Sequence, residues 1–505
     1  MRQGQSGILR SQPPFSRLTP EQCARIHEAS LEILERAGAR LFEPEAVELL
    51  REAGAQVTEG NRVRVPRDLV EEALQAAPKQ LLLYDRKGRP ALDLRGIHTY
   101  YGPGSDCMFL IDHRTGERRR PLLRDVVEGV TLCDVLEEID FVMSLFLPAD
   151  VPSEIADRYQ MEAMLNHTTK PIIFVAYDLA GCRDAVAMAE AVAGGEEALR
   201  QRPFVACYVN STTGLLHNTE ALQKLLYMAE KGLPVIYVPG TSAGVTEPVP
   251  IAGSTAVKNA GALLAVTLAQ RKRKGTPVLV PGWGGVPFDM RSLVRPYCGP
   301  DQRGVAESLA HFYGLPMFSL AGASDAKTVD EQAGIEAALT MLFEAVAGGH
   351  LVHDLGYLES GMSGSLAQLL ICAEIVSWIR HALQEVEVNE ETLAIDLVVQ
   401  KGPDGDYLKE PHTRKHFREH WYPHLLDREP YGQWAARGGK TLAQRAAERV
   451  EEILSRHRPE PLPESVASAV HAVVERAAGS LRRDILRAQR ESLTERSRHT
   501  STGGR

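Results

Sequence analysis

Aromatic and uncharged polar side chains recur in this sequence at the end of short apolar runs. In a barrel of parallel strands, catalytic and binding groups lie at the carboxyl ends of the strands, so these side chains are the first candidates for chemistry. A wall of tyrosine and tryptophan suits a quaternary ammonium group, which cannot donate hydrogen bonds and is held by the negative faces of rings. The residues at these ends are Tyr100, Tyr101, Tyr177, Tyr208, Asn210, Tyr237, Thr241, Ser242, Trp283, Ser324, Asp325, His353, Asp354 and Tyr357.

His353 and Asp354 stand together at one predicted strand end, which makes them the strongest candidates for a functional pair. Asn210 and His353 are expected to orient the polar part of a ligand. If that part is a carboxylate, a neutral amide or a protonated imidazole would donate to it. The alternative is that His353 and Asp354 form a buried structural pair and that the tyrosines belong to the core.

The residues that several common barrel reactions require are absent from the predicted strand ends. There is no strand-end lysine for a Schiff base, no cluster of histidines and carboxylates spaced for metals, and no pair of strand-end glutamates for glycoside cleavage. Glycine-rich pieces occur at 102–105, 239–244 and 281–285, but none is a P-loop or a GxGxxG motif. The sequence therefore predicts no bound metal and no nucleotide.

The elements that would position these residues form a repeating unit, in which an apolar run is followed by a turn and an Ala/Leu-rich helical stretch. Eight such units favour a (β/α)8 TIM barrel over a doubly wound sheet, which usually has fewer strands. The eight runs begin near residues 98, 140, 171, 203, 234, 277, 316 and 350.

The rest of the chain divides around this barrel, which we place at 96–390. Residues 1–95 are predicted to be a helical segment that packs on the barrel, with a helix capped by Thr19 and Gln22 and another after Pro66. A hairpin with its turn at Thr115 and Gly116 is expected after the first strand. Residues 391–492 are predicted to be a mostly helical extension, and 493–505 a disordered tail.

Composition sets broad limits on partners. The net charge of −9 gives no sign of binding to nucleic acid, and no run of about 18 apolar residues predicts a membrane span. Seven scattered cysteines, an odd number without a C-x-x-C motif, predict free thiols. Since no signal peptide is apparent either, a cytoplasmic protein is expected.

Long motifs resemble the trimethylamine methyltransferase MttB superfamily. They include D-x-Q-A-G-x-E at 330–336 and H-D-x-G-Y-L-E-S-G at 353–361. Further matching pieces are DHRTGERRRP, PGTSAGVTEPVPIAGS and GPDGDYLKEPHTRKHFREHWYPHLLDR. The resemblance runs from about residue 15 to residue 457. Two departures stand after the fifth strand, a proline in PVPIAG where threonine is expected and Gly261 where an acidic residue is expected.

The resemblance implies a barrel that demethylates a methylated amine and passes the methyl group to cobalamin on a separate corrinoid protein, with no cofactor bound tightly by this chain. The founding members carry pyrrolysine. This chain has only ordinary residues, so it resembles the branch typified by glycine betaine methyltransferase. By this resemblance the catalytic residues are Tyr101, Asn210 and His353, and Asp354, Tyr357, Gln332 and Glu336 contact the substrate. Tyr100, Tyr208 and Trp283 complete the predicted aromatic wall.

Other functions remain open at this point. Trimethylamine is an alternative substrate, a methyltetrahydrofolate-type donor would use a pocket of Asp and Asn, and a barrel that only binds betaine would have lost catalysis. A metal-dependent hydrolase is the third class, but its ligand set is missing. A homo-oligomer formed through the amphipathic C-terminal helices is also expected.

Overall fold

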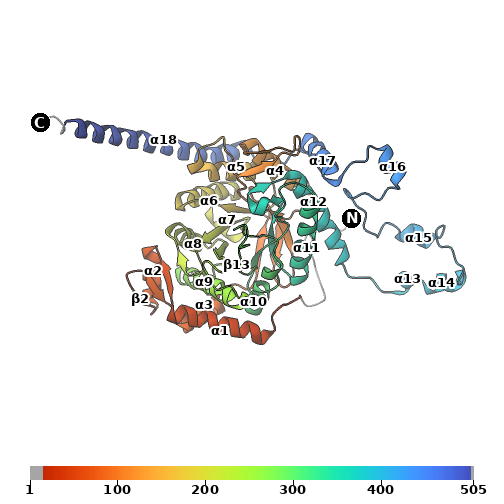
Figure 1. Cartoon of the computed structure of the whole chain (residues 1–505), viewed down its shortest axis with the longest axis horizontal. Coiled ribbons are helices and arrows are strands. Elements are labelled where there is room, and N and C mark those ends of the chain that lie inside the picture. The colour runs from red at the N-terminus through yellow and green to blue at the C-terminus, as the bar shows by residue number, and fades with distance from the viewer. Residues whose placement is uncertain (1–14, 502–505) are drawn as a thin grey trace.

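The computed structural model describes the backbone of residues 15–501 and has a parallel barrel at its centre (Figure 1). Seven strands are hydrogen-bonded in the order β6-β15-β14-β13-β12-β10-β9. From β9 to β15 each strand neighbours the next barrel strand along the chain, and the last strand, β15, pairs with the first, β6, as in a TIM barrel. The strands are β6 (Tyr100–Pro103), β9 (Ile172–Val175), β10 (Val205–Ser211), β12 (Val235–Pro239), β13 (Val278–Pro281), β14 (Met317–Leu320) and β15 (Leu351–Leu355).

An irregular extended segment at 140–147 closes the barrel where the sequence predicts the second strand. On one side the Asp140 N–H donates to Tyr101 O at 2.7 Å. On the other side the Val142 N–H donates to Pro171 O at 2.9 Å, and Val142 O accepts from the Ile173 N–H. The predicted (β/α)8 barrel is therefore confirmed, although this eighth position makes too few ladder bonds to be a regular strand.

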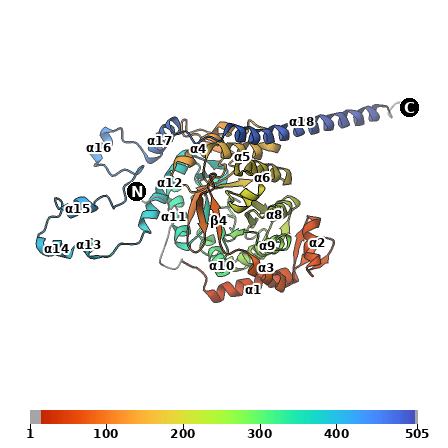
Figure 2. The ribbon, with the colours of Figure 1, turned by 180° about the vertical axis from the view of Figure 1, so that it is seen from behind.

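Helices surround the strands, and the local sequence fixes where they begin and end (Figures 1 and 2). The Asp330 side chain accepts from the Ala333 N–H at the start of α11 (Glu331–Ala347), and Gly348 ends that helix with a φ of 75°. The other barrel helices are α4 (Leu123–Val135), α5 (Ala156–His167), α6 (Leu179–Ala193), α7 (Glu196–Gln201), α8 (Thr219–Lys231), α9 (Ile251–Lys272), α10 (Ala306–Tyr313) and α12 (Leu366–Ala382).

Helix α9 is apolar around its whole circumference because it lies between two layers. It contacts β12 and β13 on one side and the N-terminal helices α1 (Pro20–Arg36) and α3 (Arg67–Ala76) on the other. By length and composition alone it would be long and apolar enough to cross a bilayer, but 78% of that apolar stretch is buried inside the fold. It is a core helix of the barrel.

The N-terminal segment contains more strand than the sequence predicts. The capping box is confirmed, because Thr19 and Gln22 exchange hydrogen bonds at the start of α1, and α3 follows Pro66. A hairpin of β4 (Leu81–Tyr84) and β5 (Pro90–Leu94) was missed, and its leucines join the core cluster inside the barrel. Between the two helices lie β1 (Ala39–Leu41), α2 (Pro44–Glu52), β2 (Gln56–Thr58) and β3 (Arg62–Arg64).

The predicted hairpin after the first barrel strand is confirmed. β7 (Phe109–Ile111) pairs antiparallel with β8 (Arg118–Arg119), and Gly116 has a φ of 75° in the turn. The hairpin also pairs with β17 (Ser363–Gly364), which in turn pairs with β16 (Tyr357–Leu358). The loop that follows β15 is thereby fastened to the loop that follows β6.

The C-terminal region leaves the barrel in two directions (Figures 1 and 2). One is an arm that carries α13 (Glu390–Leu393), α14 (Ile395–Lys401), α15 (Pro411–His416) and α16 (Tyr431–Ala436). The chain then returns through α17 (Leu442–Arg456) to α18 (Glu464–Ser501), which contacts α5 and α6 before it extends outward. Helix α18 includes 493–501, where a disordered tail is predicted, and 502–505 lie outside the described residues.

Asp140 holds the irregular segment in place, and its removal is expected to destabilise the barrel. Its carboxylate accepts from the Tyr101 N–H at 2.8 Å and pairs with Arg380, whose side chain is only 18% exposed. Asp140→Ala leaves that cation without its partner and should lower the free energy of unfolding by about 3 kcal/mol. Urea unfolding followed by circular dichroism measures the change.

The matched control is Glu32→Ala, which removes an exposed ion pair with Arg36 on α1. Exposed pairs contribute little, so this variant should unfold like the wild type. Equal effects of the two substitutions would contradict a structural role for Asp140.

Candidate active site

An open cavity of about 260 Å³ lies at the carboxyl ends of the barrel strands, the position of the active site in TIM-barrel enzymes. Its walls come from the loops that follow β6, β12 and β13, from the ends of β10 and β15, and from α9. The lining residues are Ser105, Asp106, Val175, Tyr208, Asn210, Val238, Pro239, Gly240, Thr241, Lys258, Trp283, Arg295, Tyr297, Leu320, His353, Asp354 and Tyr357.

Half of the fourteen strand-end residues named from the sequence meet in this cavity. They come from four separate parts of the barrel, which the closure of the sheet brings together. Those that line the cavity are Tyr208, Asn210, Thr241, Trp283, His353, Asp354 and Tyr357.

Tyr100 and Tyr101, predicted to contact the substrate, do not line this cavity, and the reason is geometric. Successive side chains of a strand point to opposite faces. The Tyr101 side chain points outward to the helices, where its hydroxyl donates to Met341 O at 3.0 Å. The Tyr100 hydroxyl accepts from the Asp93 N–H of the β4–β5 hairpin at 3.1 Å. The part of the loop after β6 that faces the cavity is Ser105 and Asp106.

Gln332 and Glu336 also lie outside the cavity wall, on the first turns of α11. Gln332 donates to Glu336 at 2.9 Å, and the Glu336 carboxylate accepts from Ser324 Oγ at 2.6 Å and from the Asp325 N–H at 2.9 Å. Asp325 in turn accepts from the Tyr297 N–H at 3.1 Å. In the structure Glu336 therefore positions the loop that carries Tyr297, and contact of Gln332 and Glu336 with substrate stays a prediction.

His353 and Asp354 lie close together, and their surroundings fix their ionisation. His353 Nδ1 lies 2.6 Å from Ser319 O, and because a carbonyl only accepts, Nδ1 carries the proton. Burial lowers the pKa of His353 to about 3 and raises the pKa of Asp354 to about 8. His353 Nε2 then carries no proton and lies 3.2 Å from an oxygen of the Asp354 carboxyl group. The protonated imidazole considered from sequence is not the form that this site holds.

Both members of this pair face the cavity although they are consecutive residues, which a regular strand does not allow. Asp354 has a φ of 82°, and the pairing of β15 with β6 shifts register between Val352 and Leu355. A non-glycine residue in this region costs about 1–3 kcal/mol, and such strain is found where function requires it. The kink turns the Asp354 carboxyl toward the same space as the His353 ring.

Three tyrosines form an aromatic wall beside Asp354. The rings of Tyr297 and Tyr357 lie edge to face with centroids 6.2 Å apart, and Tyr208 lies edge to face with His353 at 5.6 Å. The Tyr357 hydroxyl accepts from the Ser105 N–H at 2.7 Å and donates to Ser105 O. A Cβ at Gly104 would lie 2.0 Å from the Tyr357 ring, so only glycine fits there. Asn210 is exposed at the mouth, where its amide donates to the Tyr208 hydroxyl at 3.2 Å.

Four lining residues that can ionise or form hydrogen bonds were not predicted from the sequence. Tyr297 and Arg295 belong to the long loop after β13, which has no periodic pattern, and Lys258 is on a helix rather than at a strand end. Lys258 is 2% exposed, and its ammonium nitrogen lies 4.2 Å from the centroid of the Trp283 ring. Asp106 accepts from Gln160 at 2.7 Å, and burial raises its pKa to about 6.

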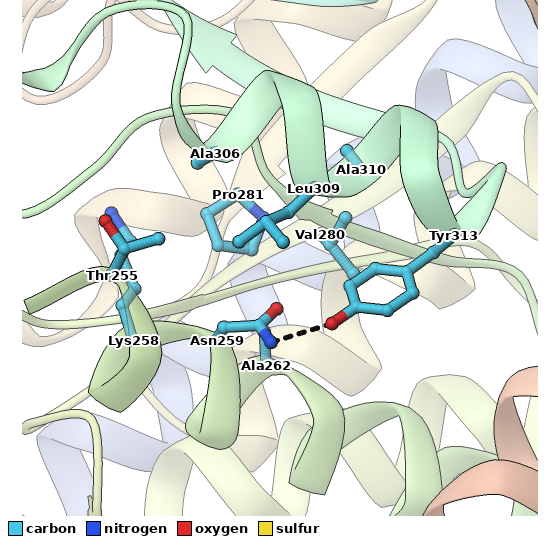
Figure 3. A pocket seen from close by; sticks show the side chains of 10 residues that line it. All are labelled: Thr255, Lys258, Asn259, Ala262, Val280, Pro281, Ala306, Leu309, Ala310 and Tyr313. Carbon is cyan, nitrogen blue, oxygen red and sulfur yellow. Dashed lines mark hydrogen bonds between the residues drawn. The ribbon is translucent and has the colours of Figure 1, made fainter. Parts of the chain in front are cut away.

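A second, smaller cavity of about 20 Å³ lies behind Lys258, between α9, β13 and α10 (Figure 3). Its wall is mostly apolar, with Leu309 and Ala310 among its residues. Asn259 closes one side by donating to the Tyr313 hydroxyl at 2.9 Å, as the dashed line in Figure 3 shows. This space holds about one water molecule and is too small for a substrate.

Comparison with known proteins places this barrel among methyltransferases. The chain belongs to the trimethylamine methyltransferase (MTTB) family, whose model matches residues 1–481. It is 33% identical to trimethylamine methyltransferase MttB of Desulfitobacterium hafniense over 477 residues, which cover 93% of this chain and 96% of that protein. It is 30% identical to a glycine betaine methyltransferase of the same species, strain Y51, over 92% of this chain and 97% of that protein.

The barrel also resembles a solved structure. The crystal structure of the Methanosarcina barkeri monomethylamine methyltransferase MtmB superposes with a TM-score of 0.50, and the match covers 88% of each chain at 12% identity. This likeness supports the fold. The predicted family is therefore confirmed, while the two curated relatives differ in the amine that their names give.

The pKa of Asp354 predicts how a quaternary cation should bind. Below pH 8 the free carboxyl is largely protonated, and it gains its charge as the pH rises. Tetramethylammonium should therefore bind about tenfold more tightly at pH 9 than at pH 6.5, measured by isothermal titration calorimetry. This dependence should be lost in Asp354→Asn, whose side chain has the same shape but does not ionise.

Asp106→Asn is the control, because the pKa of Asp106 is lower and its ionisation is nearly complete above pH 7. This variant should keep the rise in affinity between pH 7 and pH 9. A rise that persists unchanged in Asp354→Asn would show that another group is responsible.

Proposed function

We propose that this protein transfers a methyl group from a quaternary amine of the betaine type to cob(I)alamin carried by a separate corrinoid protein. The observation that carries the proposal is the aromatic wall of Tyr208, Tyr297 and Tyr357 beside the Asp354 carboxyl. Membership of the MTTB family supports the reaction class. The names of the curated relatives support a methylated amine as donor.

Substrate binding uses the rings and the carboxyl together. The ring faces attract an ammonium whose methyl groups cannot form strong hydrogen bonds. Asp354 is held protonated in the empty cavity, and an adjacent cation favours its ionised form. Asn210, whose amide holds the Tyr208 hydroxyl, orients that ring at the mouth.

The reaction needs orientation more than acid catalysis. A quaternary nitrogen that loses a methyl group leaves as a neutral tertiary amine, so no proton has to be supplied. The residues of the cavity instead hold one N–CH3 bond toward the mouth and exclude water around the other groups. Cob(I)alamin supplies the nucleophilic cobalt that accepts the methyl group.

The size of the cavity agrees with an amine that binds inside it and a corrinoid that stays on the partner protein. About 260 Å³ accommodates a small amine but not a corrinoid ring. The partner's cofactor therefore has to approach at the mouth, next to Asn210, and no residue of this chain is required to bind it permanently. Lack of pyrrolysine favours a quaternary donor, since trimethylamine is a poorer methyl donor unless it is activated.

Trimethylamine remains the second candidate, because a relative at 33% identity bears that substrate in its name. We also propose that the chain assembles with copies of itself through its C-terminal region. The arm supports this because apolar side chains along it are exposed to solvent, among them Val386 at 84%, Leu408 at 79% and Tyr431 at 78%.

Methylation of free cob(I)alamin, followed by ultraviolet–visible absorbance, tests the proposed reaction. The donors are glycine betaine, carnitine, proline betaine, γ-butyrobetaine and trimethylamine. Conversion is expected with at least one quaternary amine and not with trimethylamine. Tyr208→Leu should lower kcat/KM for that amine about tenfold through the loss of a ring face.

Tyr227→Leu, on α8 outside the cavity where Arg183 lies over its ring, is the matched control and should leave kcat/KM unchanged. Demethylation of trimethylamine alone would transfer the assignment to the second candidate. If no donor is converted under conditions in which a relative is active, the proposed methyl transfer is contradicted. The protein would then be assigned a role in binding methylated amines.

A further inference from the structure

The C-terminal arm folds without a hydrophobic core of its own. From residue 381 to residue 424, all of which the structure describes, no side chain is buried. Figures 1 and 2 show the arm standing clear of the barrel helices. Segments that bury so little apolar surface usually need a cross-link, such as a disulfide or a bound metal ion. All seven cysteines precede the arm, so a disulfide within it is excluded.

Two imidazole rings and a carboxylate meet between α13 and α15 of this arm. His412 and His416 are four residues apart in α15, so the helix places them on one face, with ring centroids 4.3 Å apart. Glu391 of α13 lies beside them, with its Oε1 3.2 Å from His416 Nε2. One potential ligand atom from each of the three residues lies within 4.8 Å of the other two.

The outer hydrogen bonds of the two rings leave one nitrogen of each ring for an ion. His416 Nδ1 lies 2.8 Å from Glu419 Oε1, and His412 Nε2 lies 2.9 Å from Glu391 O. Because a carboxylate and a carbonyl only accept, these two nitrogens carry protons. His416 Nε2 and His412 Nδ1 are then the atoms that can bind a metal. Metal-binding histidines usually donate their other N–H to such a carboxylate or carbonyl.

The charges of the cluster favour a cation at this point. The Glu391 carboxylate accepts from Lys415 Nζ at 2.5 Å, and its contacts with Lys415 and His416 lower its pKa to about 2. Hydrogen bonds to Glu419 and Glu391 raise the pKa of His416, so the cluster already attracts a proton between His416 and Glu391. A metal ion takes the place of that proton. The Lys415 side chain is 62% exposed and can turn into solvent when the ion binds.

We infer that Glu391, His412 and His416 bind a zinc ion that fastens α13 to α15. Two imidazole nitrogens and one carboxylate oxygen are a common ligand set of Zn²⁺, with water in the fourth position. His416 is 25 residues from Glu391 along the chain, so the ion closes a loop and restricts the conformations of the arm. The sequence predicts no bound metal because its candidates were the strand ends of the barrel. The inference does not depend on the proposed methyl transfer.

Another group of side chains with suitable spacing, Cys298, Asp325 and Glu336, is less suited to a metal ion. Asp325 accepts from the Tyr297 N–H at 3.1 Å and from Ser360 Oγ at 2.7 Å, and Glu336 accepts from the Asp325 N–H at 2.9 Å. Burial raises the pKa of the Cys298 thiol, whereas metals bind the thiolate. These carboxylates already position the loops around the cavity.

Calorimetric titration of the untagged full chain with Zn²⁺, after removal of metals with EDTA, tests the site. One ion should bind per chain. His416→Gln should weaken binding at least about 100-fold, and Glu419→Gln, which removes only the outer partner of His416, about tenfold. His420→Gln is the matched control, since His420 is an exposed histidine of the same arm, and Cys298→Ser excludes the other group.

Both control variants should bind Zn²⁺ like the wild type. Unchanged binding in His416→Gln would overturn the site. An equal loss in His420→Gln would show loose binding to surface histidines and would also overturn it. Loss in Cys298→Ser alone would place the ion beside the cavity instead.

Limited proteolysis tests the fastening role on the native protein. Trypsin cleaves after lysine and arginine, and Arg414, Lys415 and Arg418 lie within or directly after α15. Zn²⁺ should slow cleavage at these residues about tenfold in the wild type, because cleavage requires local opening of the arm. The ion should have no such effect in His416→Gln. Equal rates with and without Zn²⁺ in the wild type would contradict the inference.

Discussion

The site depends on the backbone kink at the end of β15. Because Asp354 adopts a φ of 82°, two consecutive residues face one cavity, and a neutral imidazole and a protonated carboxyl stand side by side. The strain is supported on both sides, since β15 pairs with β14 and β6, and the loop that follows it joins the β7–β8 hairpin through β17. The barrel thus maintains an arrangement that an isolated strand would not adopt.

Burial shifts the pKa values of ionisable groups on both sides of the cavity. On the tyrosine side, a carboxyl held protonated is ready to gain charge beside a cation. On the opposite side, the buried Lys258 ammonium lies over the Trp283 ring, and burial lowers its pKa. Family membership indicates the methyl transfer.

Much of the fold could be predicted from sequence because the strand runs are apolar and regularly spaced. The exception at 140–147 still has an apolar run, but its backbone bonds are irregular and partly replaced by the Asp140 side chain. The helix signals were also reliable where a capping residue was present, as at Thr19. The arrangement of short strands in the N-terminal segment depends on contacts with the barrel, which no local pattern shows.

Site residues at strand ends could be predicted from the sequence. Site residues on loops and helices could not. His353 and Asp354 follow directly from the end of β15, whereas Tyr101 lies outside the cavity because the direction of its side chain depends on the register of β6. Arg295 and Tyr297 are placed by a loop that Asp325 and Glu336 fasten. Lys258 gave no signal, since a lysine within a helix is usually exposed and only the layer of N-terminal helices buries this one.

A crystal structure of the protein with glycine betaine bound would test the account most directly. The account predicts that the trimethylammonium group contacts Tyr208, Tyr297, Tyr357 and Asp354, with one methyl group toward the mouth of the cavity. A trimethylammonium group bound away from these rings would contradict the central claim that the cavity recognises a quaternary ammonium group through its aromatic wall.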